Sequence, residues 1–301
     1  MTLQLTAPAK INWTLEVLGK RPDDYHEIRS VMQTISLADT LTLEPADEVT
    51  LSVWGATRGF RREARTAPES NLAYRAAHLL RERTGTRAGA YMKLSKHIPV
   101  AAGLGGGSSD AAAVLRGLRR LWQLDLSDEE LATIGAELGS DVPFFIRGGT
   151  ALISGRGEVL QPLPDVPQQR LVVAWLERAA PADKTARMYA ALRPEHYTEG
   201  SRTERLAERV LRGEPVRHEK LFNVFETVLP EVDPEAAELF ERAAALGLGP
   251  HLCGSGPAFF FLVAADRPSE PLLRALNGLG LHTIETRTLA AAEAVAFEGQ
   301  L

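Results

Sequence analysis

The sequence has little cysteine, no excess of positive charge and no long apolar run, and each absence excludes a class of protein. Cys253 is the only cysteine among 301 residues, so no internal disulfide can form, and we expect a buried, unreactive thiol. The formal net charge of −5 argues against nucleic acid or an anionic membrane surface as the main partner. No segment approaches the length of a membrane span, and Lys10 and Asn12 stand where a signal peptide needs apolar residues, so we expect a cytoplasmic protein.

The residues that are present indicate a folded α+β protein. Hydrophobic residues make up 45% of the chain and charged residues 24%, which is ordinary for a globular protein and leaves no segment that resembles a disordered one. The first third is rich in β-forming residues. Leu3 and Leu5 alternate with polar residues and apolar positions resume at Ile11, so we expect two extended segments with Lys10 at their junction. We expect a change of domain near residues 154–158, which gives an N-terminal domain of residues 1–155 and a C-terminal domain of residues 156–301.

Capping signals predict several helix boundaries. Ser70 is the expected N-cap of a helix that ends at Gly85, and Ser127 with Glu130 forms a capping box for a helix that ends at Gly139. Between them we expect a strand over 90–94, a loop over 99–107 and a helix over 108–122. For the second half we expect helices within 182–191, 206–211, 221–228, 235–246 and 270–279, and strands at 171–175, 258–263 and 282–286.

The segment from Pro99 to Ser109 combines a glycine-rich loop with a helix start. It places four glycines within the five positions 103–107 and continues into an alanine-rich helical sequence. Glycine lets the backbone approach a ligand closely, and the N-terminus of the following helix presents free N–H groups and a partial positive charge. The loop lacks the lysine of a Walker motif, and Ser108 replaces the last glycine of the dinucleotide fingerprint. The residues alone therefore predict a phosphate site, with a flexible surface turn as the alternative.

Two charged residues stand next to apolar segments and are candidates for chemistry. Asp141 directly precedes a run that must be buried, so its carboxylate can serve as a base or can cap the turn that enters Pro143. Lys10 lies among Pro8, Ala9 and Ile11, where an ordinary solvated lysine has little reason to be. A second glycine cluster, Gly254-Ser255-Gly256, precedes an apolar stretch and is fully explained as a turn that leads into a strand. None of these residues proves catalysis by itself.

Taken together, these segments resemble the signature motifs of the GHMP kinases. The resemblance rests on Pro8-Ala-Lys-Ile-Asn12, on Gly103-Leu-Gly-Gly-Gly-Ser-Ser-Asp-Ala-Ala112, on Gly139-Ser-Asp-Val-Pro-Phe144 and on Gly254-Ser-Gly256, in that order, and it covers nearly the whole chain. It implies a two-lobed α+β fold with a left-handed βαβ crossover, an exception to the usual hand, and an active site in the cleft between the lobes. It also implies a monomer or homodimer that uses ATP and Mg²⁺.

The resemblance assigns roles to individual residues. Asp141 matches the catalytic base, and Lys10 matches the cation that polarises the accepting hydroxyl and offsets charge on the transferred phosphoryl group. The residues that match the ATP site are Asn71, Lys96, Pro99, Val100, Ala101, Ala102, Gly103, Leu104, Gly105, Gly106, Gly107, Ser108 and Ser109. Ser108 is also the implied protein ligand of magnesium.

On the acceptor side, the pair Tyr25-His26 is typical of the family members that phosphorylate the 2-hydroxyl of a cytidine-diphosphate-linked methylerythritol for non-mevalonate isoprenoid synthesis. Aromatic rings with a polar edge contact suit a pyrimidine base. The residues that match the acceptor site are Asn12, Tyr25, His26, Asp141, Thr185, Tyr189, Gly254, Ser255 and Gly256. Asp24 replaces the glycine that usually precedes this pair, so the turn must accept a side chain, and aspartate tolerates left-handed geometry better than most residues do.

Two other functions are open at this point. Another GHMP kinase would act on homoserine or a mevalonate derivative, but neither acceptor carries a base for Tyr25 and His26 to bind. A ligand sensor with this fold would have lost catalysis, and the presence of both Lys10 and Asp141 argues against it.

Overall fold

The structure is a computed structural model that describes residues 2–55, 68–178, 181 and 183–300. Within these residues the main sheet has eight strands, five of which run in the order β12-β1-β2-β4-β3. Its strands are β1 (Leu3–Lys20), β2 (His26–Ala46), β3 (Val49–Gly55), β4 (Gly89–Lys96), β5 (Thr150–Ser154), β6 (Val159–Leu163), β8 (Phe222–Asn223) and β12 (Phe297–Gln300). A second sheet has the order β11-β7-β10-β9 and consists of β7 (Arg170–Trp175), β9 (His251–Leu252), β10 (Phe259–Val263) and β11 (His282–Arg287).

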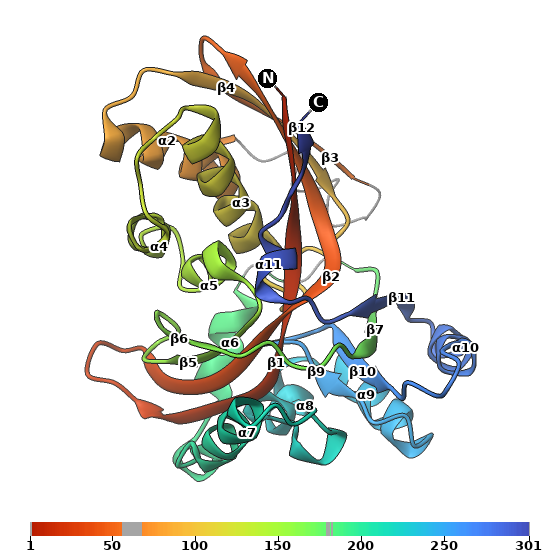
Figure 1. Cartoon of the computed structure of the whole chain (residues 1–301). Helices are drawn as coiled ribbons and strands as arrows, with labels where there is room; N and C mark the ends of the chain where they lie inside the picture. Colours follow the sequence, from red (N-terminus) through yellow and green to blue (C-terminus); the bar gives the residue numbers. More distant parts are fainter. Residues whose placement is uncertain (1, 56–67, 179–180, 182, 301) are drawn as a thin grey trace.

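Two groups of helices cover the upper and the lower part of the molecule. Figure 1 shows α2 to α5 against the upper part of the long β1–β2 hairpin, whereas α7 to α10 lie in the lower part of the molecule. The helices are α2 (Leu72–Thr84), α3 (Gly106–Leu121), α4 (Asp128–Ala136), α5 (Val142–Arg147), α6 (Lys184–Ala191), α7 (Ser201–Leu211), α8 (Leu229–Val232), α9 (Pro234–Ala245), α10 (Glu270–Gly278) and α11 (Ala291–Ala294). The mixed content confirms the α+β class.

The β1–β2 hairpin forms the middle of the main sheet. The two strands pair antiparallel from Leu3 with Leu43 to Lys20 with His26. In the connecting turn Asp24 has a φ of 63°, the left-handed geometry expected for the residue that replaces glycine. The prediction of two extended segments around Lys10 is wrong, because β1 is one continuous strand. Its register shifts between Pro8 and Ala9 and again after Asn12, and such bulges re-aim the side chains between them while pairing with β2 continues.

Small residues bring α3 close to the main sheet. Ala111, Ala112 and Ala113 are fully buried, and a Cβ at Gly117 would lie 2.3 Å from a methyl carbon of Leu43. The helix begins at Gly106, two residues before the predicted start, because Gly105 adopts a φ of 73° and forms the N-cap. This close packing fixes where the glycine loop at the N-terminus of α3 lies.

The other predicted boundaries are mostly confirmed. The N-cap of α2 is Asn71 rather than Ser70, since the Asn71 side chain accepts from the N–H of Ala73, while Gly85 ends the helix as expected. The capping box of Ser127 and Glu130 is present in α4, which ends at Ala136, before the expected Gly139. The strands predicted at 171–175, 258–263 and 282–286 are β7, β10 and β11. Residue 182, within a predicted helix, lies outside the described residues.

The helix predicted over 221–228 is wrong. Phe222 and Asn223 instead pair in parallel with Thr14 and Leu15 of β1, and a short 3-10 turn, Val224–Thr227, follows. The Asn223 side chain accepts from the N–H of Phe225 and also donates to two carbonyls of a distant loop, contacts that the local sequence does not reveal.

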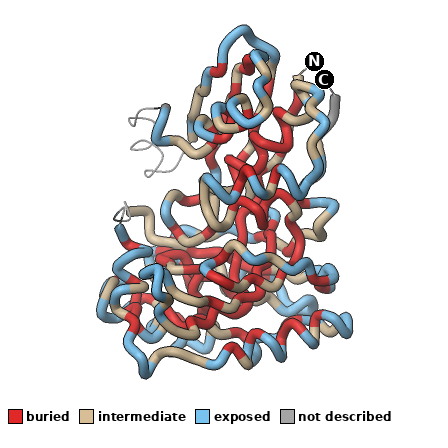
Figure 2. Tube along the Cα trace, turned by 90° about the vertical axis from the view of Figure 1, so that its left-hand side faces the viewer, coloured by how far each residue is buried: buried red, intermediate tan, exposed pale blue. Residues whose placement is uncertain are grey.

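The two sheets share side-chain contacts and a continuous core. The Thr286 hydroxyl on β11 lies 2.9 Å from the Ser36 hydroxyl and accepts from the N–H of Leu37, both on β2. Figure 2 shows buried residues running through the middle of the molecule from its upper to its lower part. The C-terminal strand β12 returns to the main sheet beside β1, so the termini lie together in Figure 1. The division at residue 155 stays a prediction. No helix in the described ranges is long and apolar enough to cross a membrane.

Candidate active site

The glycine loop before α3 is fixed on both sides. The N–H of Lys10 on β1 donates to the Leu104 carbonyl at 3.0 Å, and the Leu104 side chain is buried. Gly103 has a φ of 83°, and a Cβ there would lie 1.8 Å from the Cys253 carbonyl oxygen. These contacts rule out a flexible surface turn and require glycine at this position.

A cavity of about 300 Å³ lies along this loop. Each of the predicted ATP-site residues from Pro99 to Ser108 lines it, together with Leu72, Lys96 and Ile98. Two predicted residues lie outside the lining. Asn71 caps α2, and the buried Ser109 hydroxyl donates to the Pro8 carbonyl at 2.7 Å, tying α3 to β1. The cavity therefore offers mainly backbone groups at a helix N-terminus, an arrangement that suits phosphate.

Lys96 lines this cavity, but its charge is already balanced. Its ammonium contacts the carboxylates of Asp39 and Asp110, and all three side chains are buried. Burial disfavours the ammonium, but the two carboxylates outweigh it and raise the pKa of Lys96 above its ordinary value. The triad joins the end of β4 to β2 and to the N-terminal half of α3.

A larger cavity, of about 730 Å³, adjoins the glycine loop on its other side. The predicted residues that line it are Lys10, Asn12, Tyr25, His26, Asp141, Thr185, Tyr189, Gly254 and Ser255. Gly103 and Gly105 line both cavities, so the same short backbone segment separates them. Gly256 lies just behind the lining, in the turn between β9 and β10.

Lys10 and Asp141 face this larger cavity from different elements. The buried Lys10 ammonium donates to the Asn12 amide oxygen at 2.8 Å, and the Asn12 amide nitrogen donates to the Ser30 hydroxyl at 2.7 Å, so the lysine is oriented by a hydrogen-bonded row. Asp141 occupies the N-cap position of α5, yet its side chain makes no capping hydrogen bond. Of its two predicted roles, the geometry favours a carboxylate available to a ligand.

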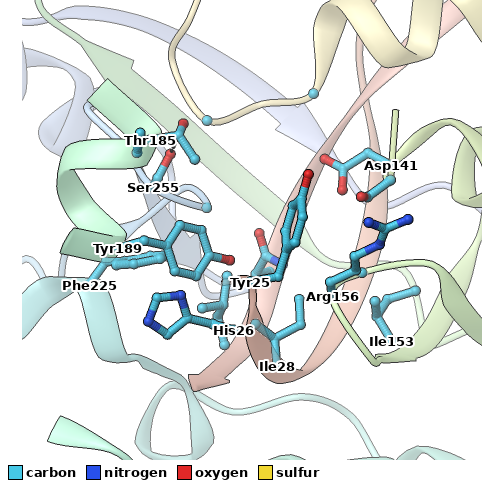
Figure 3. Close-up of a pocket in the computed structure, with 18 of the residues that line it drawn as sticks. Tyr25, His26, Ile28, Asp141, Ile153, Arg156, Thr185, Tyr189, Phe225 and Ser255 are labelled. Carbon is cyan, nitrogen blue, oxygen red and sulfur yellow. Dashed lines mark hydrogen bonds between the residues drawn. The ribbon is translucent and has the colours of Figure 1, made fainter. Parts of the chain in front are cut away.

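Aromatic side chains form one end of the cavity. His26 stacks on Tyr189 with ring centroids 5.0 Å apart, and Phe225 packs edge-on against Tyr189. In Figure 3 Tyr25 stands between the Tyr189–His26 pair and the Asp141 side. Tyr25 is 54% exposed, and the Arg156 guanidinium lies 4.8 Å from its ring centre. The aromatic group thus has an open face for a planar ligand.

Burial tunes two of these groups. Burial and the nearby charge of Asp141 raise the pKa of Tyr189 to about 12, so its phenol stays protonated. Partial burial, with a smaller effect of Lys20, lowers the pKa of His26, so its ring is neutral at pH 7. A neutral imidazole can donate and accept one hydrogen bond each.

The sequence did not point to Arg156 or Phe225. Arg156 lies in a turn between Gly155 and Gly157, both with positive φ, where an arginine is normally solvated. Phe225 reads as an ordinary core residue. Only the fold brings both side chains to the cavity.

Comparison with known proteins identifies the family of this site. The family model of the GHMP kinases N terminal domain matches residues 71–149, which include the glycine loop and Asp141. A 4-diphosphocytidyl-2-C-methyl-D-erythritol kinase of Dehalococcoides mccartyi is 41% identical over 294 residues, which are 95% of this chain and 98% of the relative. The enzyme of that name from Symbiobacterium thermophilum is 43% identical over 95% of this chain and 100% of its own length.

The chain belongs to the 4-diphosphocytidyl-2-C-methyl-D-erythritol kinases of the GHMP family. It is therefore an ATP-dependent small-molecule kinase. A crystal structure of a 4-(cytidine 5'-diphospho)-2C-methyl-D-erythritol kinase shares its fold with a TM-score of 0.77 and 36% identity, and the match covers 95% of this chain and 99% of that one.

More distant GHMP kinases share the fold alone. The homoserine kinase of Cytophaga hutchinsonii has a TM-score of 0.73 over 99% of this chain and 97% of its own, with 14% identity. The predicted GHMP-kinase fold is confirmed.

Proposed function

We propose that the protein transfers the γ-phosphoryl group of ATP to the 2-hydroxyl of 4-diphosphocytidyl-2-C-methyl-D-erythritol. The observation that carries this proposal is the wall that the two cavities share. Gly103 and Gly105 separate a backbone-lined cavity suited to phosphate from a larger cavity that contains Lys10 and Asp141. A phosphoryl group held at that wall has an acceptor hydroxyl, a carboxylate and an ammonium on its far side.

The residues at the wall can perform the transfer. Asp141 accepts the proton of the acceptor hydroxyl. The oxygen of that hydroxyl forms a bond to the γ-phosphorus, and the bond from the γ-phosphorus to the β-phosphate oxygen, which leaves with ADP, breaks. Lys10, oriented by Asn12, lies where negative charge develops on the transferred group. The N–H groups of the loop and of the first turn of α3 hold the phosphates.

The large cavity fits the rest of the acceptor. A cytosine can pack between Tyr25 and Tyr189, with the neutral His26 at its polar edge. Arg156 supplies a positive charge beside this position for the diphosphate. In this arrangement residues 1–155 hold ATP, and residues 156–301 add Thr185, Tyr189 and the turn at 254–256 to the acceptor side.

Magnesium fits the same cavity through oxygen ligands. Ser108 lines the nucleotide cavity, and its hydroxyl lies 3.8 Å from the position a Cβ would take at Gly139, two residues before Asp141. No cluster of three or more metal-binding side chains occurs in the part of the chain that the structure describes, so the phosphates would supply most of the ligands. When bound, the ion neutralises phosphate charge.

The test is a phosphoryl-transfer assay with Mg-ATP and three acceptors side by side: the cytidine-diphosphate-linked methylerythritol, mevalonate and homoserine. Mevalonate and homoserine carry no base for Tyr25, His26 and Tyr189 to bind. We therefore expect kcat/KM to be higher for the cytidine-diphosphate-linked methylerythritol by roughly 10³-fold or more. A higher kcat/KM for mevalonate or homoserine would identify another GHMP kinase. Absence of turnover with all three, in the presence of bound ATP, would identify a sensor.

A further inference from the structure

Lys184 is a buried lysine directly behind the proposed acceptor site. It is the first residue of α6, its side chain is only 5% exposed, and it does not line either cavity. The next residue, Thr185, does line the acceptor cavity, and its hydroxyl lies 2.9 Å from that of Ser255. The start of α6 therefore holds the turn at 254–256 from two directions.

The side chain of Lys184 binds backbone carbonyls of this turn. Its ammonium donates to the Ser255 carbonyl at 2.7 Å and also to the Gly256 carbonyl. Asn223 complements it by donating to the carbonyls of Leu252 and Gly254. The two buried side chains together satisfy three carbonyls of the turn and one at the end of β9, which fixes the shape of the turn.

The turn held in this way contacts the groups proposed for catalysis. A Cβ at Gly254 would lie 2.9 Å from the Lys10 ammonium and 2.8 Å from the Gly103 carbonyl oxygen. A displacement of the turn would therefore move the surroundings of Lys10 and of the ATP loop together.

The charges around Lys184 leave its own charge poorly compensated. Burial, followed by the repulsion of Lys10 and Arg178, lowers the pKa of Lys184 to about 7, although Asp233 opposes the shift. Asp233 is itself paired with the Arg178 guanidinium. Cys253, which also lies near Lys184, stays a neutral thiol because burial raises its pKa to about 12.

We propose that Lys184 is a positioning residue of the phosphoryl transfer. It fixes the turn at 254–256 through the two carbonyls, and it places a second positive charge, beside that of Lys10, behind the wall against which the anionic acceptor binds. An acceptor diphosphate brings negative charge to a site where two cations repel each other, so its binding favours the protonated lysine. This inference rests on the proposed function.

Two variants distinguish the two parts of this role, the hydrogen bonds to the turn and the positive charge. Lys184→Met removes both hydrogen bonds and the charge, and we expect the KM of the acceptor to rise roughly ten- to a hundredfold with a smaller change in kcat, since the turn loses its fixed position. Lys184→Gln keeps two N–H donors on a side chain one bond shorter than that of lysine and has no charge. We expect the ratio of its acceptor KM to that of the wild type to be at least about threefold larger at pH 7, where the wild-type lysine becomes protonated, than at pH 9.

The expected difference in acceptor KM between pH 7 and pH 9 arises from Lys184 and not from His26. The lowered pKa of His26 puts its titration below this range, and both variants retain His26. Lys93→Met is the matched control, because the Lys93 ammonium pairs with Glu44 at 2.7 Å on β4 and β2, outside the lining of both cavities. Its acceptor KM should equal that of the wild type throughout.

Two results overturn the inference: a wild-type acceptor KM in Lys184→Met, or a ratio of the Lys184→Gln KM to the wild-type KM that is the same at pH 7 and pH 9. If Lys184→Met does not fold, the comparison with Lys184→Gln decides alone. Failure of the wild type to phosphorylate the acceptor concerns the proposed function instead, and it is established first in the same assay.

Discussion

Asp141 occupies a helix N-cap without acting as a cap. Aspartate is among the best capping residues, and α5 would gain stability from such a bond, yet the carboxylate is turned to the acceptor cavity. The Asp141 backbone lies in the αR region rather than in the extended conformation of a capping residue, so the carboxylate is left available to a ligand. This supports the proposed role of the carboxylate as a base.

We predict that Asp141→Asn leaves the affinity for ATP within about twofold and lowers kcat by roughly 10²- to 10⁴-fold, because only the proton-accepting oxygen is lost. Titration calorimetry with ATP and steady-state kinetics check the two halves. Asp125→Asn, at an exposed loop carboxylate, serves as the control and should behave as the wild type. Near-normal turnover of Asp141→Asn would remove Asp141 from the mechanism.

At the scale of elements, the site depends on contacts between two glycine-containing turns. The loop before α3 and the turn between β9 and β10 touch through their backbones, at Gly103 and Cys253. Backbone contacts of this kind tolerate no side chain, so the glycines are needed for packing as well as for ligand access.

Gly103→Ala tests this contact. The new methyl group would meet the Cys253 carbonyl at 1.8 Å, and alanine is strained at a φ of 83°, so we expect a loss of at least ~2 kcal/mol in the free energy of unfolding. Gly107→Ala is the matched comparison, since its methyl group would lie 3.5 Å from Leu72 inside a helix, and its stability should stay equal or rise. Urea unfolding of both variants gives the result. Equal stability of the two would show that the turns separate freely.

At the scale of the whole molecule, the buried charge of Lys184 links stability to pH. The pKa of this lysine is about 7 in the folded protein and 10.5 in its ordinary state. Between these values the unfolded chain binds a proton that the folded chain does not, so the folded state gains stability as pH rises and loses it as pH falls towards 7. The proposed role of Lys184 near neutral pH therefore depends on its protonated form, which lowers the stability of the folded state.

We predict that the free energy of unfolding of the wild type, relative to Lys184→Met, increases between pH 7.5 and pH 9.5 by up to ~1.4 kcal/mol per pH unit. Tyr189 and the other titrating groups are common to both proteins and cancel. Lys93→Met should run parallel to the wild type in this range, because Glu44 raises the pKa of Lys93 above its ordinary value. Parallel curves for wild type and Lys184→Met would contradict the lowered pKa. Urea denaturation at pH 7.5, 8.5 and 9.5 provides the curves.

The sequence alone determined the parts that depend on local chemistry. The glycine loop, the capping box of Ser127 and the helix end at Gly85 follow from the conformational preferences of a few adjacent residues. The order of Lys10, the glycine loop, Asp141 and Gly254 was enough to indicate the kinase family. The resemblance to the family, which usually has glycine at this position, indicated an unusual turn at Asp24, and its φ is 63°.

The tertiary structure alone decided what depends on distant segments. Phe222 and Asn223 form a strand because β1 lies beside them, more than 200 residues earlier in the chain. Arg156 and Lys184 read as solvated charges until the fold places one over Tyr25 and the other beneath the turn at 254–256. Burial and pairing across the chain set these contacts, and no local pattern encodes them, because the energies involved exist only after segments far apart in the chain have packed together.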